Sequence, residues 1–245
     1  MKIAVAGKGG TGKTTFAGFL IDYLVEKRRT PVLAIDCDPN TNLHEVLGVQ
    51  IKDTVGNIRE SAVKEMMPSG MARQDFIEYK IQSSLVEAEG FDLIAMGVPE
   101  GPGCYCFPNS VIRDCIERLS GQYRYVVIDN EAGMEHLSRR TAGDCDILFI
   151  ISDPSFRGVE TAIKIRDIGE SLNISFNKIF LVINRSEEGL NKKTEEIIER
   201  EKIDLLGMIP EDRRLKEADE DGIPIATIDS LAKRKFKELM EKIGL

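Results

Sequence analysis

The sequence predicts an α/β fold: a doubly wound, mostly parallel sheet of about eight strands, with helices on both faces. Short β-branched apolar runs alternate with amphipathic helical patterns along the chain, as in sheets whose strands are joined by crossover helices. The first of these runs leads into a glycine-rich loop, and later runs end in acidic or amide side chains. In such sheets the carboxyl ends of the strands form the ligand crevice. We expect a single domain over residues 1–245.

Composition narrows the functional classes. The chain has 245 residues, of which 42% are hydrophobic and 30% charged, as in soluble proteins that bury a core. The net charge of −8 argues against nucleic acid as a partner. No apolar run approaches the roughly 20 residues of a membrane span, and the first strand follows directly without a signal peptide. We therefore expect a cytoplasmic protein with no membrane role.

The glycine-rich loop carries the first chemical signal. Residues 7–14 match the phosphate-binding pattern GxxxxGK[ST], with a predicted strand over 2–6 and a predicted helix over 14–27. In this P-loop, backbone N–H groups surround a phosphate, the lysine reaches the β- and γ-phosphates, and the hydroxyl binds Mg²⁺. Lys13 is therefore expected to hold phosphate and Thr14 the magnesium ion. The residues expected to bind the nucleotide here are Gly7, Gly9, Gly10, Thr11, Gly12, Lys13, Thr14 and Thr15.

Two later strands end in acidic residues. The strand over 31–36 continues into DCDPNTNL, and Asp38 is expected to face the ligand crevice. The alternative is a simple turn before a short helix over 42–47, because Asp and Pro favour turns. The strand over 123–129 ends in Asp129, the Walker B pattern, which predicts a carboxylate beside the magnesium shell. The segment 130–140 then enters a helix and is placed to respond to the γ-phosphate.

The remaining elements follow from periodicity. Strands are expected over residues 91–96, 145–151, 177–184 and 203–209, and helices over 55–64, 109–119 and 155–172. Residues 76–81 alternate apolar and polar side chains, which predicts a half-buried edge strand, and residues 66–71 are expected to be a loop. The tail, 229–245, is a basic amphipathic helix that is expected to dock on its own sheet, with membrane binding as the alternative.

Five cysteines, an odd number, favour thiol or metal chemistry over a disulfide framework. Cys104 and Cys106 lie in the Gly- and Pro-rich segment PEGPGCYCFPNS, and side chains two apart in an extended stretch point to one side. Two thiolates suit a soft or borderline metal but supply half of the usual four ligands, so a two-fold axis would complete the site. The alternative is two incidental small hydrophobes. The other three, Cys37, Cys115 and Cys145, are expected in or near the core.

Lys8 is unusual at the second position of the P-loop. The stretch KGGTGKT resembles the deviant P-loop of the MinD/ParA/nitrogenase-iron-protein class. The resemblance implies that Lys8 acts on the partner's nucleotide across a two-fold axis, in a homodimer that closes on ATP; a solvated surface lysine is the alternative. It also implies that Asp38 positions the attacking water, and that Asn184 contacts adenine. The loop IPED, which contains Pro210, Glu211 and Asp212, resembles the loop that covers the adenine.

The resemblance narrows when all motifs are taken together. KGGTGKTT, DCDPNTNL, PEGPGCYCFPNS, VVIDNEAGMEHLSRR, SDPSFRGVETA and IPED are similar to CooC-type ATPases, the nickel-delivery factors for carbon monoxide dehydrogenase, and to their acetyl-CoA synthase counterparts. This implies an ATPase in which Lys8, Lys13, Asp38 and Asp129 support hydrolysis to ADP and phosphate. Cys104 and Cys106 of each subunit would share one Ni²⁺ or Zn²⁺ that is passed to the client enzyme.

Two rival functions remain open at this point. An iron–sulfur reductase like the nitrogenase iron protein needs a second cysteine three residues after the Walker B aspartate, where this chain has Ala132. A positioning ATPase like MinD would use the basic tail helix on a membrane, and would leave the Cys-x-Cys segment without a task.

Overall fold

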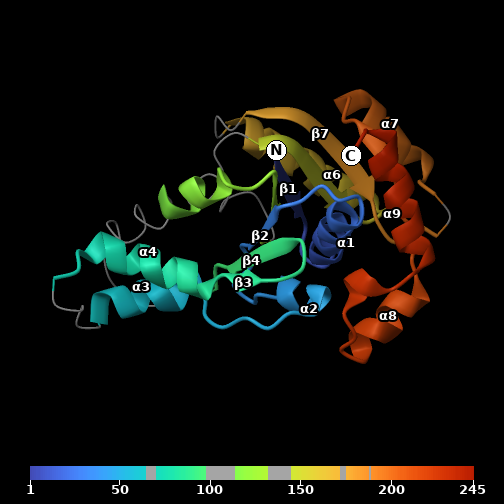
Figure 1. Ribbon diagram of the computed structural model, residues 1–245. Coiled ribbons are helices and arrows are strands. Elements are labelled where there is room, and N and C mark those ends of the chain that lie inside the picture. Colours follow the sequence, from blue (N-terminus) through green and yellow to red (C-terminus); the bar gives the residue numbers. More distant parts are fainter. Residues whose placement is uncertain (65–69, 98–113, 132–144, 172–174, 188) are drawn as a thin grey trace.

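The computed structural model describes residues 1–64, 70–97, 114–131, 145–171, 175–187 and 189–245 (Figure 1). Cys104 and Cys106 lie outside these ranges, as do most of the predicted segment 130–140 and most of the predicted loop 66–71.

The described residues form one eight-stranded sheet. Its strands are β1 (Lys2–Gly7), β2 (Val32–Asp36), β3 (Val86–Glu87), β4 (Phe91–Ala95), β5 (Tyr125–Asp129), β6 (Cys145–Ser152), β7 (Phe176–Ile183) and β8 (Leu205–Met208). They lie in the order β3-β4-β2-β5-β1-β6-β7-β8, and every neighbouring pair is parallel except β3 with β4. The predicted doubly wound, mostly parallel sheet is therefore confirmed.

Helices cover both faces of this sheet (Figure 1). They are α1 (Lys13–Glu26), α2 (Leu43–Leu47), α3 (Val55–Lys64), α4 (Arg73–Ser84), α6 (Phe156–Ser171), α7 (Lys192–Glu201), α8 (Arg213–Glu220) and α9 (Leu231–Lys242), with a 3₁₀ turn, η2 (Ile225–Thr227). Residues 114–120 are also helical, and they overlap the helix predicted for 109–119.

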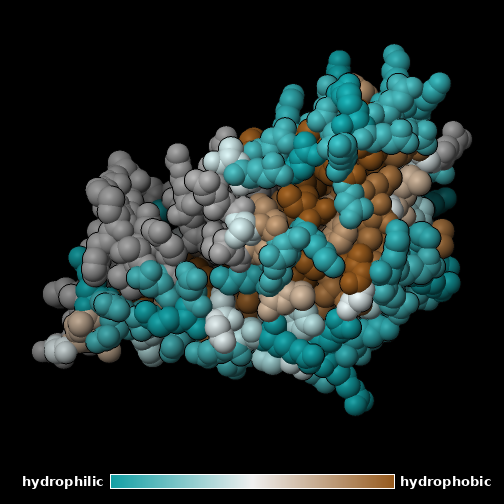
Figure 2. All heavy atoms as spheres, turned by 90° about the horizontal axis from the view of Figure 1, so that it is seen from above, coloured by the Kyte–Doolittle hydropathy of each residue, from teal (hydrophilic) through white to brown (hydrophobic). Residues whose placement is uncertain are grey.

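Because successive side chains of a strand point to opposite faces, each central strand feeds two cores. In β1, Ile3 and Val5 belong to the core under α1 and α9, whereas Ala4 and Ala6 belong to the core under α3, α4, α6 and α7. Figure 2, a view from above that of Figure 1, shows the resulting band of hydrophobic residues between hydrophilic borders. The strands read as continuous apolar runs because they are buried on both faces.

The predicted edge strand over 76–81 is wrong, since these residues lie within α4. Ile77, Ile81 and Ser84 are buried, at helical spacings of four and three. A six-residue alternation of apolar and polar side chains fits one turn and a half of helix as well as it fits a strand. One edge of the sheet is instead the two-residue strand β3, which pairs antiparallel with β4, and β8 forms the other edge.

The tail helix docks on its own sheet, as expected. Phe236 of α9 is fully buried, and its ring lies 5.0 Å from that of Phe16, 5.7 Å from that of Phe19 and 6.2 Å from that of Tyr23. Among the helices that the structure describes, none is both long and apolar enough to cross a membrane.

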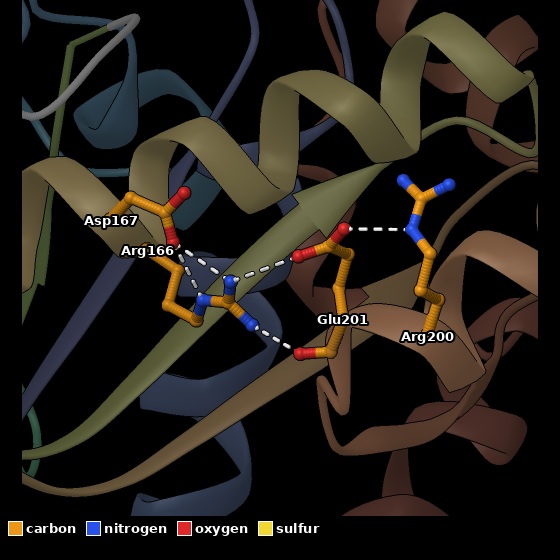
Figure 3. A network of polar contacts seen from close by, with 4 residues as sticks. All are labelled: Arg166, Asp167, Arg200 and Glu201. Carbon is orange, nitrogen blue, oxygen red and sulfur yellow. Dashed lines mark hydrogen bonds and ion pairs between the residues drawn. The ribbon is translucent and has the colours of Figure 1, made fainter.

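On the other face, an arginine ties α6 to the end of α7 (Figure 3). Arg166 donates through Nη1 to the backbone carbonyl of Glu201 at 2.7 Å, and through Nη2 to the Asp167 carboxylate at 2.8 Å. Glu201 also accepts a hydrogen bond from Arg200 at 3.0 Å. A cation at the carboxyl end of a helix binds its free carbonyls and opposes the helix dipole. This contact holds the carboxyl end of α7 against α6.

Candidate functional site

The P-loop connects β1 to α1 at the carboxyl edge of the sheet. Gly10 and Gly12 have φ angles of 78° and 89°, in the left-handed region that glycine adopts without strain. The Thr11 hydroxyl donates to the Lys8 carbonyl at 2.8 Å, and Lys13 Nζ donates to the same carbonyl at 3.3 Å. Gly7 packs so closely on β6 that a Cβ there would clash with the Ile151 carbonyl. The loop is thus formed by its own backbone, with its lysine folded back over it.

Lys13 is buried among carboxylates. Burial lowers the pKa of its ammonium group, while Asp129, Asp38 and Glu131 act in the opposite direction. A phosphate bound in the loop would add a close negative partner for this ammonium group. Lys8, in contrast, is exposed.

Two acidic residues end neighbouring strands. Asp36 of β2 and Asp129 of β5 are register partners, and both are buried. Asp36 accepts hydrogen bonds from the backbone N–H groups of Asp38 and Leu43, each at 3.0 Å. Burial raises the pKa of Asp36 to about 6, although these two hydrogen bonds act to lower it. Asp36 therefore shapes the loop between β2 and α2, a role that the sequence reasoning missed although the residue closes a predicted strand.

Asp129 is different because its carboxylate is left open. It is 1% exposed, and neither of its oxygens has a hydrogen bond of standard geometry to any described residue. Burial raises its pKa to about 7, and the charge of Asp36 adds to this effect, while the nearby Thr14 hydroxyl and Lys13 act in the opposite direction. A buried charge without partners is costly, so this carboxylate is suited to a cationic ligand.

These residues fit a magnesium ion. Mg²⁺ prefers oxygen ligands and usually keeps several waters, with one or two protein groups and the phosphates of the substrate. Thr14 would hold it, with Asp129 facing its water shell. Within the described ranges, no group of three or more His, Cys, Asp or Glu side chains could hold a metal by itself, so the nucleotide would supply the remaining ligands.

Asp38 takes part in a turn in this structure. Its Oδ1 accepts hydrogen bonds from the backbone N–H of Asn40 at 2.8 Å and from the Asn40 side chain at 3.0 Å. This is the turn geometry that the sequence allowed as an alternative. The charge of the Asp38 carboxylate still acts to raise the pKa of Lys13. The loop between β2 and α2 therefore lies beside the P-loop.

A cavity of about 370 Å³ lies beside the P-loop, and we call it the Asn184 cavity. Its lining includes residues from α1, the end of β7, the segment after β8, and the start of α9: Gly12, Thr15, Phe16, Asn184, Arg185, Pro210, Glu211, Asp212 and Ala232. Asn184 Nδ2 donates to the Thr11 carbonyl at 2.8 Å, and a Cβ on Gly12 would clash with that Nδ2. The predicted base-contacting residues therefore meet at one cavity, in contact with the P-loop.

Asp212 shapes the wall of this cavity. One oxygen accepts from the Arg214 N–H at 3.0 Å, capping α8, and the other accepts from the Ala232 N–H at 3.1 Å, at the start of α9. Burial alone would raise the pKa of Asp212, but the hydrogen bonds from Ala232, Arg214 and Leu231 outweigh it and lower the pKa. The carboxylate thus joins two helices that are distant in sequence.

The structure describes three of the five cysteines, and these three lie in or near the core, as expected. Cys115 and Cys145 are buried and Cys37 is half-buried, which confirms their placement in or near the core. Cys104 and Cys106 lie outside the described residues.

Comparison with known proteins agrees with this geometry. Residues 2–225 match the family described as the CobQ/CobB/MinD/ParA nucleotide binding domain. The chain is 40% identical over 249 residues to an uncharacterized ATP-binding protein of Methanocaldococcus jannaschii, covering 99% of this chain and 98% of the relative. It is 30% identical over 262 residues to the carbon monoxide dehydrogenase accessory protein CooC of Rhodospirillum rubrum, covering 100% and 98%. The solved structure of MinD from Pyrococcus horikoshii, complexed with Mg-ADP, superposes with a TM-score of 0.72 at 21% identity, covering 99% and 95%.

Proposed function

The chain belongs to the CobQ/CobB/MinD/ParA family of nucleotide-binding domains, and from this premise we propose that it is an ATP-dependent nickel metallochaperone. In this proposal the protein closes as a homodimer on ATP and holds one Ni²⁺, or Zn²⁺, between paired Cys-x-Cys segments. It then delivers the metal to carbon monoxide dehydrogenase or acetyl-CoA synthase.

The observation that carries the ATPase part is the open carboxylate of Asp129 beside Thr14 and Lys13. Lys13 and the backbone N–H groups of residues 9–14 bind the phosphates, and Thr14 holds the magnesium ion. When bound, Mg²⁺ neutralises charge on the β- and γ-phosphates.

Hydrolysis converts ATP and water to ADP and phosphate. Asp38 orients the attacking water, and Lys8 of the partner subunit offsets the charge that develops on the transferred phosphoryl group. The exposed position of Lys8 on the P-loop supports this role. Adenine would occupy the Asn184 cavity, where Asn184 offers both a donor and an acceptor and Pro210 and Glu211 form part of the wall.

The metal part rests on Cys104 and Cys106 and on the similarity to CooC. Closing the dimer would bring two Lys8 residues to two γ-phosphates and four thiolates to one metal. Both ligands then favour the same closed state, so each strengthens the binding of the other by the same factor.

A MinD-like positioning ATPase is the second candidate. The septum site-determining protein MinD of Bacillus subtilis is 25% identical over 233 residues, covering 91% of this chain. Its use of a tail helix on a membrane would require exposed apolar side chains. In α9, however, Phe236, Leu239 and Met240 are buried in the core, so these side chains are not exposed for contact with a membrane.

The experiment that tests the proposal is metal stoichiometry per dimer, with and without a nonhydrolysable ATP analogue. We expect one Ni²⁺ per wild-type dimer, bound more tightly with the analogue, and none in the double variant Cys104→Ser/Cys106→Ser. Cys145→Ala, which changes a buried cysteine of β6, serves as the control and should keep the metal.

Specific metal in the double variant, or none in the wild type, would overturn the metal site and leave the positioning ATPase as the better function. A brown colour after anaerobic purification would instead favour the iron–sulfur reductase.

A further inference from the structure

A second hollow, of about 720 Å³, lies between α2 and the segment that joins α8 to η2, and we call it the α2–α8 groove. Figure 1 shows these elements facing each other at the lower edge of the molecule. One wall carries His44 and Glu45, and the opposite wall carries Asp219 and Ile223. No residue of the P-loop lines this groove.

The groove is open and mixed in character. Glu45, Gln50 and Asp219 are exposed, and Ile223 leaves 48% of its surface accessible, which is high for an isoleucine. Pockets for small molecules enclose most of the ligand surface, whereas an open groove suits a stretch of polypeptide laid along it. The apolar side chains of Val49, Ile51 and Ile223 would contact the side chains of that stretch.

The charge of the groove specifies a cationic occupant. Glu45 and Asp219 line opposite walls of the groove, and Asp219 lies in the last turn of α8, where the helix dipole is also negative. Within the described part of the chain, neither of these two carboxylates forms an ion pair. Lysine or arginine side chains entering the groove would relieve this concentration of negative charge.

The groove is built onto the nucleotide site. Its α2 wall begins where Asp36 accepts the Leu43 N–H at 3.0 Å, and His44 Nδ1 lies 2.5 Å from the Thr41 carbonyl in the same loop. On the other side, Asp219 and Ile225 line both this groove and the Asn184 cavity. An occupant of the groove therefore contacts two elements that also surround the nucleotide.

We propose that the α2–α8 groove docks an extended segment of a partner protein in which lysine or arginine residues alternate with apolar ones. The site goes beyond the metallochaperone proposal and does not depend on it.

The test measures fluorescence anisotropy of a labelled nine-residue peptide with the repeat Lys-Leu-Ser, at about 0.15 M salt, where long-range attraction is screened. Two comparison peptides have the repeats Glu-Leu-Ser and Lys-Ser-Ser. We expect the Lys-Leu-Ser peptide to bind at least tenfold more tightly than either. Equal binding of Lys-Ser-Ser would indicate a simple cation site and would overturn the peptide groove, as would equal binding of Glu-Leu-Ser or no binding at all.

Variants locate the binding. The double variant Glu45→Lys/Asp219→Lys should bind the Lys-Leu-Ser peptide at least tenfold more weakly than the wild type. Ile223→Ser, which keeps the charge, should bind it at least threefold more weakly. The control Glu196→Lys/Glu199→Lys makes the same change in net charge at exposed positions of α7 and should bind like the wild type. An equal loss in the control would show general attraction to an acidic protein and overturn the proposal. Because this test uses neither nickel nor nucleotide, its failure would leave the metallochaperone proposal intact, and the reverse also holds.

Discussion

Asp36 and Asp129 lie side by side at the carboxyl ends of β2 and β5, but Asp36 accepts two backbone N–H groups whereas Asp129 has the Thr14 hydroxyl and Lys13 nearby. Both are buried at the floor of the P-loop. The same residue type thus serves two purposes at adjacent positions. Asp36 organises the loop that follows its strand, while Asp129 remains open for a cation.

This pair predicts how stability depends on pH in the ligand-free protein. Burial raises the pKa of Asp129 from 3.8 to about 7, so between about pH 4 and 7 the unfolded chain loses this proton and the folded chain keeps it. Ionisation therefore favours unfolding, and the free energy of unfolding falls as pH rises through this window. The Asp129→Asn variant has no ionisable group at this position. Its free energy of unfolding at pH 8 should therefore exceed that of the wild type by on the order of 1–4 kcal/mol.

Urea denaturation at pH 4 and pH 8 measures this effect. The stability of the variant should still depend on pH to some extent, because burial also raises the pKa of Asp36, to about 6. Glu196→Gln, at an exposed position of α7, is the control and should follow the wild type. A stability gain in Asp129→Asn of the same size at both pH values would contradict the assignment.

Lys8→Ala tests the dimer. The variant should bind nucleotide nearly as the wild type does, because only backbone atoms of Lys8 take part in the P-loop contacts. It should fail to dimerise with ATP and lose roughly 100-fold or more in hydrolysis, as when a trans-acting cation is removed. Sedimentation velocity with an ATP analogue reports dimerisation, and normal dimerisation of Lys8→Ala would refute the cross-subunit role.

Gly12→Ala tests the contact between the P-loop and the Asn184 cavity. A methyl group there would displace the Asn184 carboxamide, at a φ of 89°. We expect ATP affinity to fall by roughly tenfold or more, since a left-handed non-glycine residue alone costs about 1–2 kcal/mol. Gly10→Ala is the matched control, with a φ of 78° but no atom within 4 Å of the added carbon, and should lose less.

Titration calorimetry measures both affinities. In an Asn184→Ala background the penalty of Gly12→Ala should shrink, because its steric partner has been removed. An unchanged penalty would mean that backbone strain alone explains the loss.

Phe236→Ala tests the docking of α9. Removing a fully buried ring that packs on Phe16, Phe19 and Tyr23 should lower the free energy of unfolding by about 3–5 kcal/mol. Leu231→Ala, on the same helix but 63% exposed, should change it by less than about 0.5 kcal/mol.

The wild type with ATP should also fail to float with liposomes, whereas flotation would revive the MinD-like function.

Local patterns were sufficient for the parts of the fold that local contacts determine. The β1–P-loop–α1 unit and the strand ending at Asp129 are both visible in the sequence, because apolar runs, glycine spacing and terminal acids lie within a few residues of each other. The error at 76–81 has the same origin, since a short window contains both the helical and the strand period.

Contacts between distant segments could not be predicted in this way. The loop motif predicts a nucleotide contact for Asp212, but it does not indicate that the Asp212 carboxylate accepts a hydrogen bond from the backbone of Ala232, 20 residues later. The α2–α8 groove likewise joins residues 41–54 to residues 219–225, and no local pattern indicates that they meet. The role of Asp36 depends on Leu43, seven residues away across an irregular loop.

The Asn184 cavity takes its lining from both ends of the chain, from Gly12 to Ala232. Domains begin to fold during synthesis from the amino terminus, so the P-loop leaves the ribosome long before α9 does. A nascent chain that ends before α9 therefore lacks the part of the cavity wall that Ala232 supplies. Any ligand that needs the whole lining can therefore be selected only when translation is nearly finished.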